Sequence, residues 1–483
     1  MPLIDSDSEK CNASELDLFS ILPTDVSFPD SQIWHIENPV TSISSGGVID
    51  FTINSNPEVY LDLRSSFINI EFSITDSSGA EIIKTRPAPA TDTLNDADQL
   101  AAANTINKAK IAFPEQYIIG SIFKNVEVWI NDTLVSSADN LYPYRAYIET
   151  LLSYNKHVKN EQLRMSGYFN DTGGDAGMEW RDADVLVDEI SGNDKRIINK
   201  GVNERFMLTK YGKKMQVIGR IHADMFNQTK YIPGKNQIKV KFIRNTPEFF
   251  LRSADDNSKF TFKIEKMVLA IKKSEVSPHL RMAHEKKLQL DKTFTAKYAY
   301  PHIQMKFFMQ PSAQRHINEP NLCNGLIPNK IVIGLVSSDA LNGSYGKNPF
   351  NFKNMGATSV ILRKNGNPAP FQELSLDFPN DRYFMGYLSL MIGTGRLFEN
   401  DGLGITPEEY KNGKCLYVFD LTNTSTKECM SLQQTGKVSL DIRLDENVPE
   451  GITVVAFLQY DSVLHINSDA EVTLSNRNGV SEI

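Results

Sequence analysis

Apolar and polar residues alternate along four well-separated segments of this chain. They lie at residues 68–74, 238–242, 260–265 and 438–444, and in the first of them isoleucine or phenylalanine occupies every even position. Successive side chains of a β-strand point to opposite faces, so a period of two predicts strands with one buried face. Such strands occur in both halves of the chain.

Two further segments are apolar throughout. Ile331–Val336 and Ile452–Leu458 contain almost no polar side chain, and both are short. Runs of this length predict strands that are covered on both faces, as where a sheet meets a neighbouring layer.

A strand pair followed by a short aromatic helix is predicted twice. The first copy spans residues 126–135 and 143–152, and the second spans 360–368 and 379–391. In each predicted helix four apolar residues form one stripe, and each member of the second stripe lies 239 positions after its counterpart: Tyr144, Ile148, Leu151 and Leu152, then Tyr383, Tyr387, Leu390 and Met391.

The residues around these stripes repeat in the same order. Asn131-Asp132 and Asn365-Gly366 precede the two predicted helices, and such residues tolerate the positive φ of tight hairpin turns. Pro143 and Pro379 come just before the stripes, where a missing N–H costs a helix nothing. The repeat therefore indicates two similar domains.

Many strands, few helices and long irregular connections predict an all-β protein. We expect two tandem β-sandwiches with Greek-key or jelly-roll connections, short helices and long inserted loops. Sequential βαβ alternation is absent from the pattern.

The domain organisation follows from these elements. We expect a flexible acidic N-terminal arm at 1–15, a first sandwich at 16–275, a linker at 276–297 and a second sandwich at 298–483. Two insertions interrupt the first sandwich near 76–114 and 171–203; the former carries a possible small helix at 96–107, and loops of this size serve contacts or lie at a mobile tip.

Composition narrows the class of protein. The 483 residues are 41% hydrophobic, contain no long apolar run and begin without the apolar core of a secretory signal, so we expect an intracellular protein with no membrane span. Four scattered cysteines fit a reduced compartment rather than a disulfide framework. A net charge of −8 disfavours generic nucleic-acid binding, and the basic stretch between the halves is best explained as a solvated linker.

Catalytic and metal-binding signatures are lacking, so we expect no catalytic, cofactor-binding or metal-binding residues and no cofactor. His279 and His284 are five apart, which is not the spacing that aims two imidazoles of a helix at one metal. A cation at Asp171–Asp175 is a weaker hypothesis than a solvated loop. The cysteines Cys323, Cys415 and Cys429 have no local signature of a nucleophile. A carboxylate pair on distant strands would leave no local pattern, and it stays open.

Aromatic side chains offer two interpretations. They could form a platform for a sugar, but the helical spacing of most of them favours packing in the core. The residues concerned are Trp34, Trp129, Trp180, Tyr142, Tyr144, Tyr147, Tyr383 and Tyr387.

Six motifs, in order along nearly the whole chain, resemble one family. They are Ser14–Asp25, Tyr60–Leu63, Tyr142–Tyr154, Gly219–Phe226, Asn348–Phe352 and Leu416–Leu421. Through them the chain resembles the double jelly-roll major capsid proteins of Polinton (Maverick) elements and adintovirus-like viruses. None of these motifs is a catalytic signature.

The resemblance implies a structural protein of two jelly rolls that self-assembles as a homotrimeric, pseudo-hexameric capsomer of an icosahedral virion. It implies a single jelly-roll penton protein and other minor capsid proteins as partners, and enclosed DNA that is not bound by sequence. The insertions would form an outer tower or trimer clasp, and the arm would reach under neighbouring capsomers.

A second hypothesis is an intracellular tandem β-sandwich protein that binds or hydrolyses carbohydrate. It requires acids and aromatic residues clustered in one cleft, whereas the capsid hypothesis requires long loops and an arm for contacts between subunits. A capsid-derived gene domesticated by a cellular host is a third possibility, which one sequence cannot separate from a viral copy.

Overall fold

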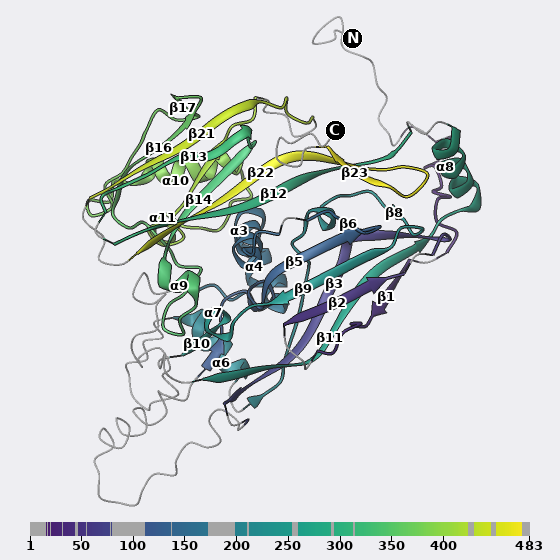
Figure 1. Cartoon of the computed structure of the whole chain (residues 1–483), viewed down its shortest axis with the longest axis horizontal. Helices are drawn as coiled ribbons and strands as arrows, with labels where there is room; N and C mark the ends of the chain where they lie inside the picture. The colour runs from purple at the N-terminus through teal and green to yellow at the C-terminus, as the bar shows by residue number, and fades with distance from the viewer. Residues whose placement is uncertain are drawn as a thin grey trace, which may run out of the picture.

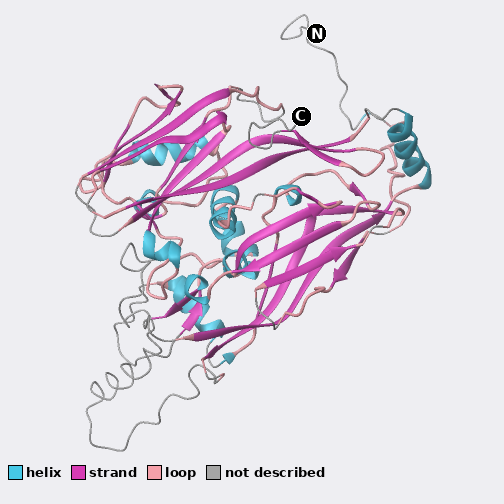
Figure 2. Cartoon of the chain, viewed as in Figure 1, coloured by secondary structure: helices cyan, strands magenta, loops and turns pink. Residues whose placement is uncertain are grey.

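The computed structural model consists of two β-sandwiches with helices between them and one helix at the far end of the first sandwich (Figure 2). It describes residues 16–475 apart from several gaps. The gaps are 17, 20, 31, 44–46, 55, 78, 80–111, 137, 172–198, 210–211, 254–258, 291–293, 313, 424–428 and 446–450.

The first sandwich is made of two sheets. One has the order β1-β11-β3-β7, with β8 also pairing with β3, and the other has the order β2-β9-β5-β6; β4 pairs separately with β10. The strands are β1 (Ile33–Glu37), β2 (Val48–Ile53), β3 (Val59–Asp76), β4 (Ala112–Pro114), β5 (Phe123–Ile130), β6 (Thr133–Leu134), β7 (Met215–Gly219), β8 (Ile232–Pro233), β9 (Ile238–Arg244), β10 (Leu251–Ser253) and β11 (Phe260–Glu275).

The second sandwich is built in the same way. Its sheets have the orders β12-β22-β14-β20, with β23 beside β22, and β13-β21-β16-β17, with β18 beside β16; β15 pairs with β19. The strands are β12 (Ala296–Gln310), β13 (His316–Leu326), β14 (Lys330–Ser337), β15 (Phe352–Lys353), β16 (Ala357–Lys364), β17 (Asn367–Pro368), β18 (Leu374–Ser375), β19 (Asn412–Gly413), β20 (Leu416–Asp420), β21 (Thr435–Leu444), β22 (Ile452–Ile466) and β23 (Val472–Ser475).

The two sandwiches share one strand order. If the strands of the four large sheet paths are numbered along the chain within each sandwich, both sandwiches have the orders 1-8-3-6 and 2-7-4-5. Eight antiparallel strands in two sheets with these long-range pairings form a jelly roll. The prediction of an all-β double jelly roll is therefore confirmed, and β1 and β12 are counterparts.

The predicted strands have the burial that their patterns require. Ile68, Ile70, Phe72 and Ile74 of β3 are all buried, while the residues between them are more exposed or polar. The apolar run of β14 is buried at every position from Ile331 to Ser337. The alternation of apolar and polar residues thus predicted correctly which face of the strand is buried. β14 is covered on both faces, as predicted.

Both predicted hairpin turns are present. Asn131 and Asp132 have φ values of 48° and 65° between β5 and β6, and Asn365 and Gly366 have values of 52° and 85° between β16 and β17. In both turns the asparagine Oδ1 accepts a hydrogen bond from the adjacent strand, from Gln237 N at 2.9 Å and from Lys437 N at 2.8 Å.

The helices confirm the stripes but not both prolines. Helix α3 (Tyr142–Ser153) has Pro143 in its first turn, as predicted. Helix α10 (Phe384–Gly393) begins five residues after Pro379, which lies in a turn, so the prediction for that proline is wrong. The turn is held instead by Asp377, whose carboxylate pairs with the side chains of Asn380 and Arg382.

Short helices fill the connections. They are α2 (Ile118–Ser121), α4 (Lys156–Asn160), η2 (Gln162–Ser166), α6 (Lys200–Thr209), η5 (Asp224–Phe226), α7 (Pro247–Phe250), α9 (Ser338–Asn342) and α11 (Pro407–Lys411). The predicted linker holds α8 (Pro278–Leu290), which has no buried residue and lies at the far end of the molecule (Figure 1).

Most of the two predicted insertions lies outside the described residues. This includes the possible helix at 96–107 and the centre of the second insertion, of which residues 200–203 begin α6. The predicted arm at 1–15 also lies outside them.

Candidate functional site: the junction between the two sandwiches

Helix α3 lies between the two sandwiches and carries aromatic residues of the junction (Figure 1). The ring of Tyr147 stacks on Phe350 with centroids 4.4 Å apart and an interplanar angle of 12°, and Tyr144 meets Phe350 and Phe352 edge-on. Phe350 and Phe352 belong to the second sandwich and are fully buried. The two hydrophobic cores are therefore continuous through α3.

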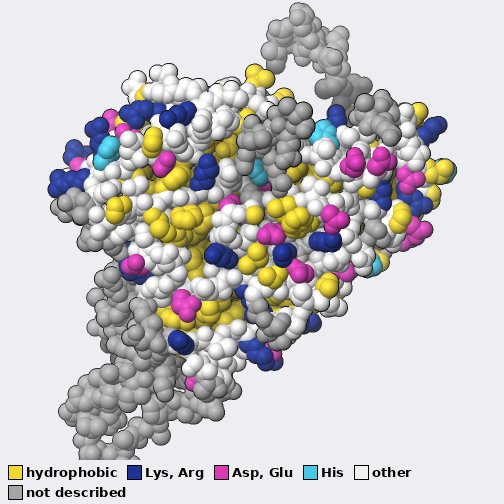
Figure 3. All heavy atoms as spheres, viewed as in Figure 1, with side chains coloured by type: hydrophobic (Ala, Val, Ile, Leu, Met, Phe, Trp, Pro, Cys, Tyr) yellow, Lys and Arg dark blue, Asp and Glu magenta, His cyan; other side chains and the backbone are white. Residues whose placement is uncertain are grey.

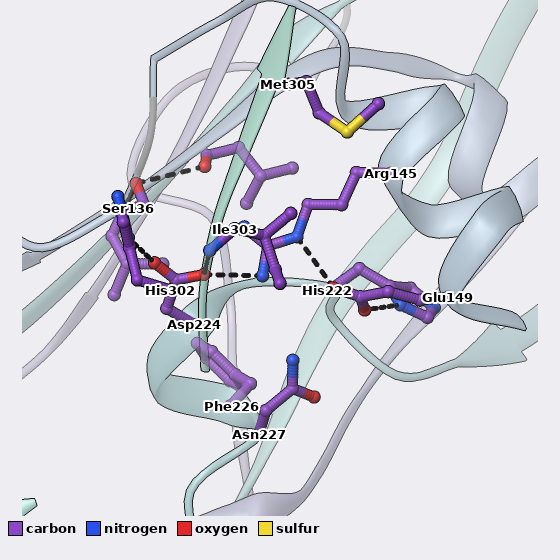
Figure 4. Close-up of polar contacts among 12 residues, drawn as sticks. Ser136, Arg145, Glu149, His222, Asp224, Phe226, Asn227, His302, Ile303 and Met305 are labelled. Atoms are coloured by element: carbon purple, nitrogen blue, oxygen red, sulfur yellow. Dashed lines mark hydrogen bonds and ion pairs between the residues drawn. The ribbon is translucent and has the colours of Figure 1, made fainter. Parts of the chain in front are cut away.

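A buried carboxylate also joins the two sandwiches. Asp224 of η5 lies with one oxygen 2.7 Å from Arg145 Nη2 and with the other 2.6 Å from His302 Nδ1 (Figure 4). The backbone N–H of Ile303 also donates to Asp224, at 3.3 Å. Because His302 and Ile303 belong to β12, a single side chain of the first sandwich holds the first strand of the second.

Glu149, one turn after Arg145 on α3, completes the network. Its carboxylate lies 3.0 Å from Arg145 Nε and 2.6 Å from His222 Nδ1, and the Tyr117 hydroxyl lies 2.5 Å from His222 Nε2. A neutral imidazole protonated at Nδ1 satisfies both contacts, because it donates to Glu149 and accepts from Tyr117.

The pKa values in the network follow from burial and pairing. Burial by itself would raise the pKa of Glu149, but Arg145 and His222 lower it to about 2. Burial would likewise lower the pKa of Arg145, yet Asp224 and Glu149 raise it. Burial lowers the pKa of His222 despite its contact with Glu149. At neutral pH Glu149 is therefore ionised, Arg145 is charged and His222 is neutral.

Further polar contacts cross the junction. The backbone N–H of Met305 donates to Asp139 at 2.9 Å, and Asn131 Nδ2 donates to the carbonyl of Ala470 at 2.8 Å. The buried amine of Lys159 donates to the carbonyl groups of Leu151 and Leu403, at 2.6 and 2.8 Å. Burial, together with the charge of Lys414, lowers the pKa of Lys159 to about 7.

The junction also contains a cavity of about 230 Å³. It is lined by Ile148 and Leu152 of α3 and, from the second sandwich, by Val332 and Phe457. Residues of both sandwiches thus form its wall, which makes the cavity a property of their relative placement.

A second buried cluster joins the bases of the two insertions. Arg205 of α6 pairs with Asp171 through two hydrogen bonds of 2.9 and 3.2 Å, and it donates to the carbonyl of Pro114 at 2.9 Å. Glu115 is fully buried beside it, with Arg252 on its other side. The described ends of both insertions therefore meet at one place on the first sandwich.

The residues considered as metal ligands or nucleophiles lie in separate places. Asp171 forms an ion pair with Arg205, and Asp175 lies outside the described residues. His284 lies 3.0 Å from the Tyr60 hydroxyl, on α8. Cys323 and Cys415 are buried, and burial raises the pKa of Cys415 to about 12. Among the described residues no group of three or more His, Cys, Asp or Glu is arranged to hold a metal ion.

The aromatic residues considered as a platform for a sugar differ in their burial. Tyr142, Tyr144, Tyr147 and Tyr383 are buried, as expected for core packing, and Tyr387 is half-buried. Trp34 is exposed on β1, Trp129 is half-buried and Trp180 lies outside the described residues.

The sequence did not identify the junction network as a site, although a signal was present. Arg145 and Glu149 belong to the motif Tyr142–Tyr154, and His222 and Asp224 belong to Gly219–Phe226. Two of the motifs that carry the family resemblance therefore meet in space. Phe350 and Phe352 come from a third, Asn348–Phe352.

Sequence comparison finds a relative of which this chain covers nearly the whole length. No protein-family model matches the chain. An uncharacterised protein of Caenorhabditis elegans is 25% identical over 442 residues, which cover 90% of this chain and 94% of that protein. No helix among the described residues is long and apolar enough to cross a membrane.

Solved structures of viral capsids have a similar fold. A structure of the Sputnik virophage matches with a TM-score of 0.58 and 15% identity, over 100% of this chain and 95% of that one. The capsid of the virus PBCV-1 matches with 0.52 and 12%, over 95% and 100%, and the Faustovirus major capsid protein with 0.51 and 8%, over 92% and 93%. At these identities the matches establish the fold, and this chain is a double jelly roll.

Proposed function

We propose that this chain is a major capsid protein of the Polinton and adintovirus kind, which trimerises into a pseudo-hexagonal capsomer and builds an icosahedral shell. The observation that carries the proposal is the repetition of one strand order in two sandwiches fixed side by side by a buried junction.

The repetition has a geometric consequence. A homotrimer of a doubled domain presents six similar walls, so three chains can occupy a position of hexagonal outline. This requires a fixed angle between the two sandwiches, and the buried contacts of Asp224 and the aromatic stack on Phe350 provide rigidity at that place.

The comparisons support the proposal from two directions. The similar solved structures come from viral capsids, and they span nearly the whole chain. The relative from an animal, Caenorhabditis elegans, is consistent with an element carried in a host genome, as a Polinton element is.

The surface supports a protein that works through contacts. Hydrophobic side chains gather in several patches across the middle of one face (Figure 3). Patches of this kind mark interaction sites on proteins. The charged groups of the junction pair with one another, which fits a structural rather than a catalytic role.

The remaining parts of the proposal follow from the resemblance to the capsid proteins of Polinton elements and adintovirus-like viruses. The domains are 16–275 and 298–483, joined by 276–297, with 1–15 as an arm on the inner side of the shell. The two insertions form one tower or clasp, which the common root at Arg205 supports. The shell encloses DNA without reading its sequence, and a single jelly-roll penton protein and other minor capsid proteins complete the virion.

The molar mass in solution tests the proposal. Size exclusion coupled to light scattering, at several salt concentrations, is expected to give a species near three times the chain mass of 54.3 kDa, or larger shells. A strict monomer at every concentration would contradict the proposal and favour a tandem sandwich that binds carbohydrate, for which glycan screening is the next experiment.

A further inference from the structure

We propose that the exposed side of α10 in one copy docks on the outer face of the sheet β1-β11-β3-β7 in the next copy, around Trp34 and Ile36. This inference rests on the trimer proposed above and identifies its seam. It comes from a difference between the two sandwiches, which share a strand order but do not have the same neighbours.

Helices α3 and α10 are counterparts that pack alike on their own sandwiches. Each follows the hairpin of strands 4 and 5 and precedes strand 6 of its sandwich. Ser389 and Leu390 of α10 are fully buried, as are Thr150 and Leu151, the α3 residues 239 positions earlier. The inner faces of the two helices are therefore equivalent.

Other positions of α3 and α10 differ in exposure. Arg145 of α3 is 4% exposed and pairs with Asp224, which holds β12 of the second sandwich. Ala146 is 0% exposed and packs on Gly120 of α2 in its own sandwich. The corresponding residues of α10, Phe384 and Met385, are 59% and 42% exposed. Two large apolar side chains of α10 thus face solvent where the corresponding residues of α3 are buried, one of them next to the contact with the second sandwich.

The strand of the second sandwich that meets the first sandwich has a counterpart as well. In the second sandwich Ile303 and Met305 lie on β12, are 2% and 3% exposed, and receive the contacts of Asp224 and Asp139 from the first sandwich. In the first sandwich the counterpart strand is β1, where Trp34 and Ile36 are 47% and 56% exposed.

The orientation of Trp34 and Ile36 fits this role. Residues that pair across two antiparallel strands lie on the same face of the sheet. His35 and Glu37 pair with Ile271 and Leu269 of β11, which are core residues. Trp34 and Ile36 pair instead with Lys272 and Ala270. Trp34 and Ile36 therefore lie on the outer face of the sheet, away from the core of their sandwich. The outer face is the one that β12 presents to the first sandwich.

The two exposed patches can pair between copies, because each chain has one of each. Each copy offers one α10 patch, Phe384 and Met385, and one β1 patch, Trp34 and Ile36, and both are apolar. A head-to-tail contact between different patches closes into a ring when its rotation divides a full turn. A ring of six sandwiches from three copies forms if the rotation that relates the two sandwiches of one chain is one sixth of a turn and is repeated between chains.

Charge substitutions on each patch test the seam. We expect Phe384→Glu and Ile36→Glu each to raise the protein concentration at which the trimer dissociates by at least 100-fold, measured by light scattering over a dilution series. Both side chains are exposed, so the thermal unfolding midpoint of the monomer should stay within a few degrees of the wild type. The matched control is Met282→Glu, at an exposed apolar residue of α8, which should leave the trimer unchanged.

The outcomes separate this inference from the function on which it rests. If the wild type forms trimers and both variants dissociate while the control does not, the seam is supported. If the wild type forms trimers and either variant remains trimeric at the wild-type dissociation concentration, the seam is wrong and the capsid proposal stands. If the wild type is monomeric, both fail.

Discussion

The Nδ1 atom of His302 lies 2.6 Å from Oδ2 of Asp224, and this contact ties the first strand of the second sandwich to the first sandwich. Asp224 is fully buried and also faces Arg145, whose side chain is nearly as buried. The junction thus depends on a contact that water does not reach.

Replacing Asp224 with asparagine should therefore weaken the whole chain. The substitution leaves Arg145 with one carboxylate instead of two, and removing one member of a buried pair costs about 3 kcal/mol or more. Urea unfolding followed by circular dichroism measures the loss. The matched control is Asp132→Asn, in an exposed ion pair with Lys239, which should change the free energy of unfolding by less than about 1 kcal/mol. Equal effects of the two substitutions would contradict the role given to Asp224.

Acid should destabilise the protein in two stages. The pKa of His222 is lowered in the folded state, so the unfolded chain binds the extra proton first and stability falls as the pH drops below about 6.5. The pKa of Glu149 is about 2 when folded, against an ordinary value of 4.5, so a further loss of about 3 kcal/mol develops between pH 4.5 and 2.

The free energy of unfolding measured from pH 7 to pH 2 checks both stages. His222→Gln removes the first titrating group and should flatten the profile between pH 6.5 and 5. A stability that stays constant from pH 7 to pH 4 would show that the network does not hold these protonation states.

The two hairpin asparagines should respond to the same substitutions. Asn365→Ala loses the bond to Lys437 N and forces alanine into positive φ, for a cost of about 2 kcal/mol, whereas Asn365→Gly keeps the backbone relaxed and costs about 1 kcal/mol. Asn131→Ala should cost more than Asn365→Ala, because Asn131 also donates to Ala470 in the second sandwich. Thermal unfolding of the three variants tests this order, and an alanine that matches glycine at position 365 would contradict it.

Gly393 should not tolerate a methyl group although it ends a helix. A Cβ at this position would lie 2.4 Å from Cγ1 of Val418 on β20. Gly393→Ala should therefore destabilise by about 1–3 kcal/mol, against the usual preference of helices for alanine. Gly402→Ala is the control, since nothing lies within 4 Å of its added Cβ. Unfolding midpoints of the two variants compare them, and a neutral or stabilising Gly393→Ala would show that α10 lies farther from the sheet.

Removal of residues 1–15 should separate the capsomer from the shell. If the arm reaches under neighbouring capsomers, the truncated protein still forms trimers but assembles fewer shells, as seen by light scattering and electron microscopy against the full-length chain. Normal shells from the truncated protein would end the arm's proposed role.

Local patterns determined much of this fold. The alternation in β3 gave its buried face, and the Asn-containing turns and the stripes of α3 and α10 were enough to predict a duplicated all-β chain. These features depend on backbone periodicity and on φ preferences, which involve residues close in sequence. For the same reason the second proline was misjudged, since nothing local showed that α10 starts only after the turn around Asp377.

The site was decided by tertiary structure. Arg145, Asp224 and His302 come from three segments far apart in the sequence, and the local pair of Arg145 with Glu149 on α3 does not indicate that Asp224 and His302 lie beside it. The helices α3 and α10 have similar stripes, yet Arg145 and Ala146 of α3 are buried whereas Phe384 and Met385 of α10 face solvent. A periodic pattern specifies which side of an element is apolar, whereas the surface that covers its other side depends on how whole sheets pack.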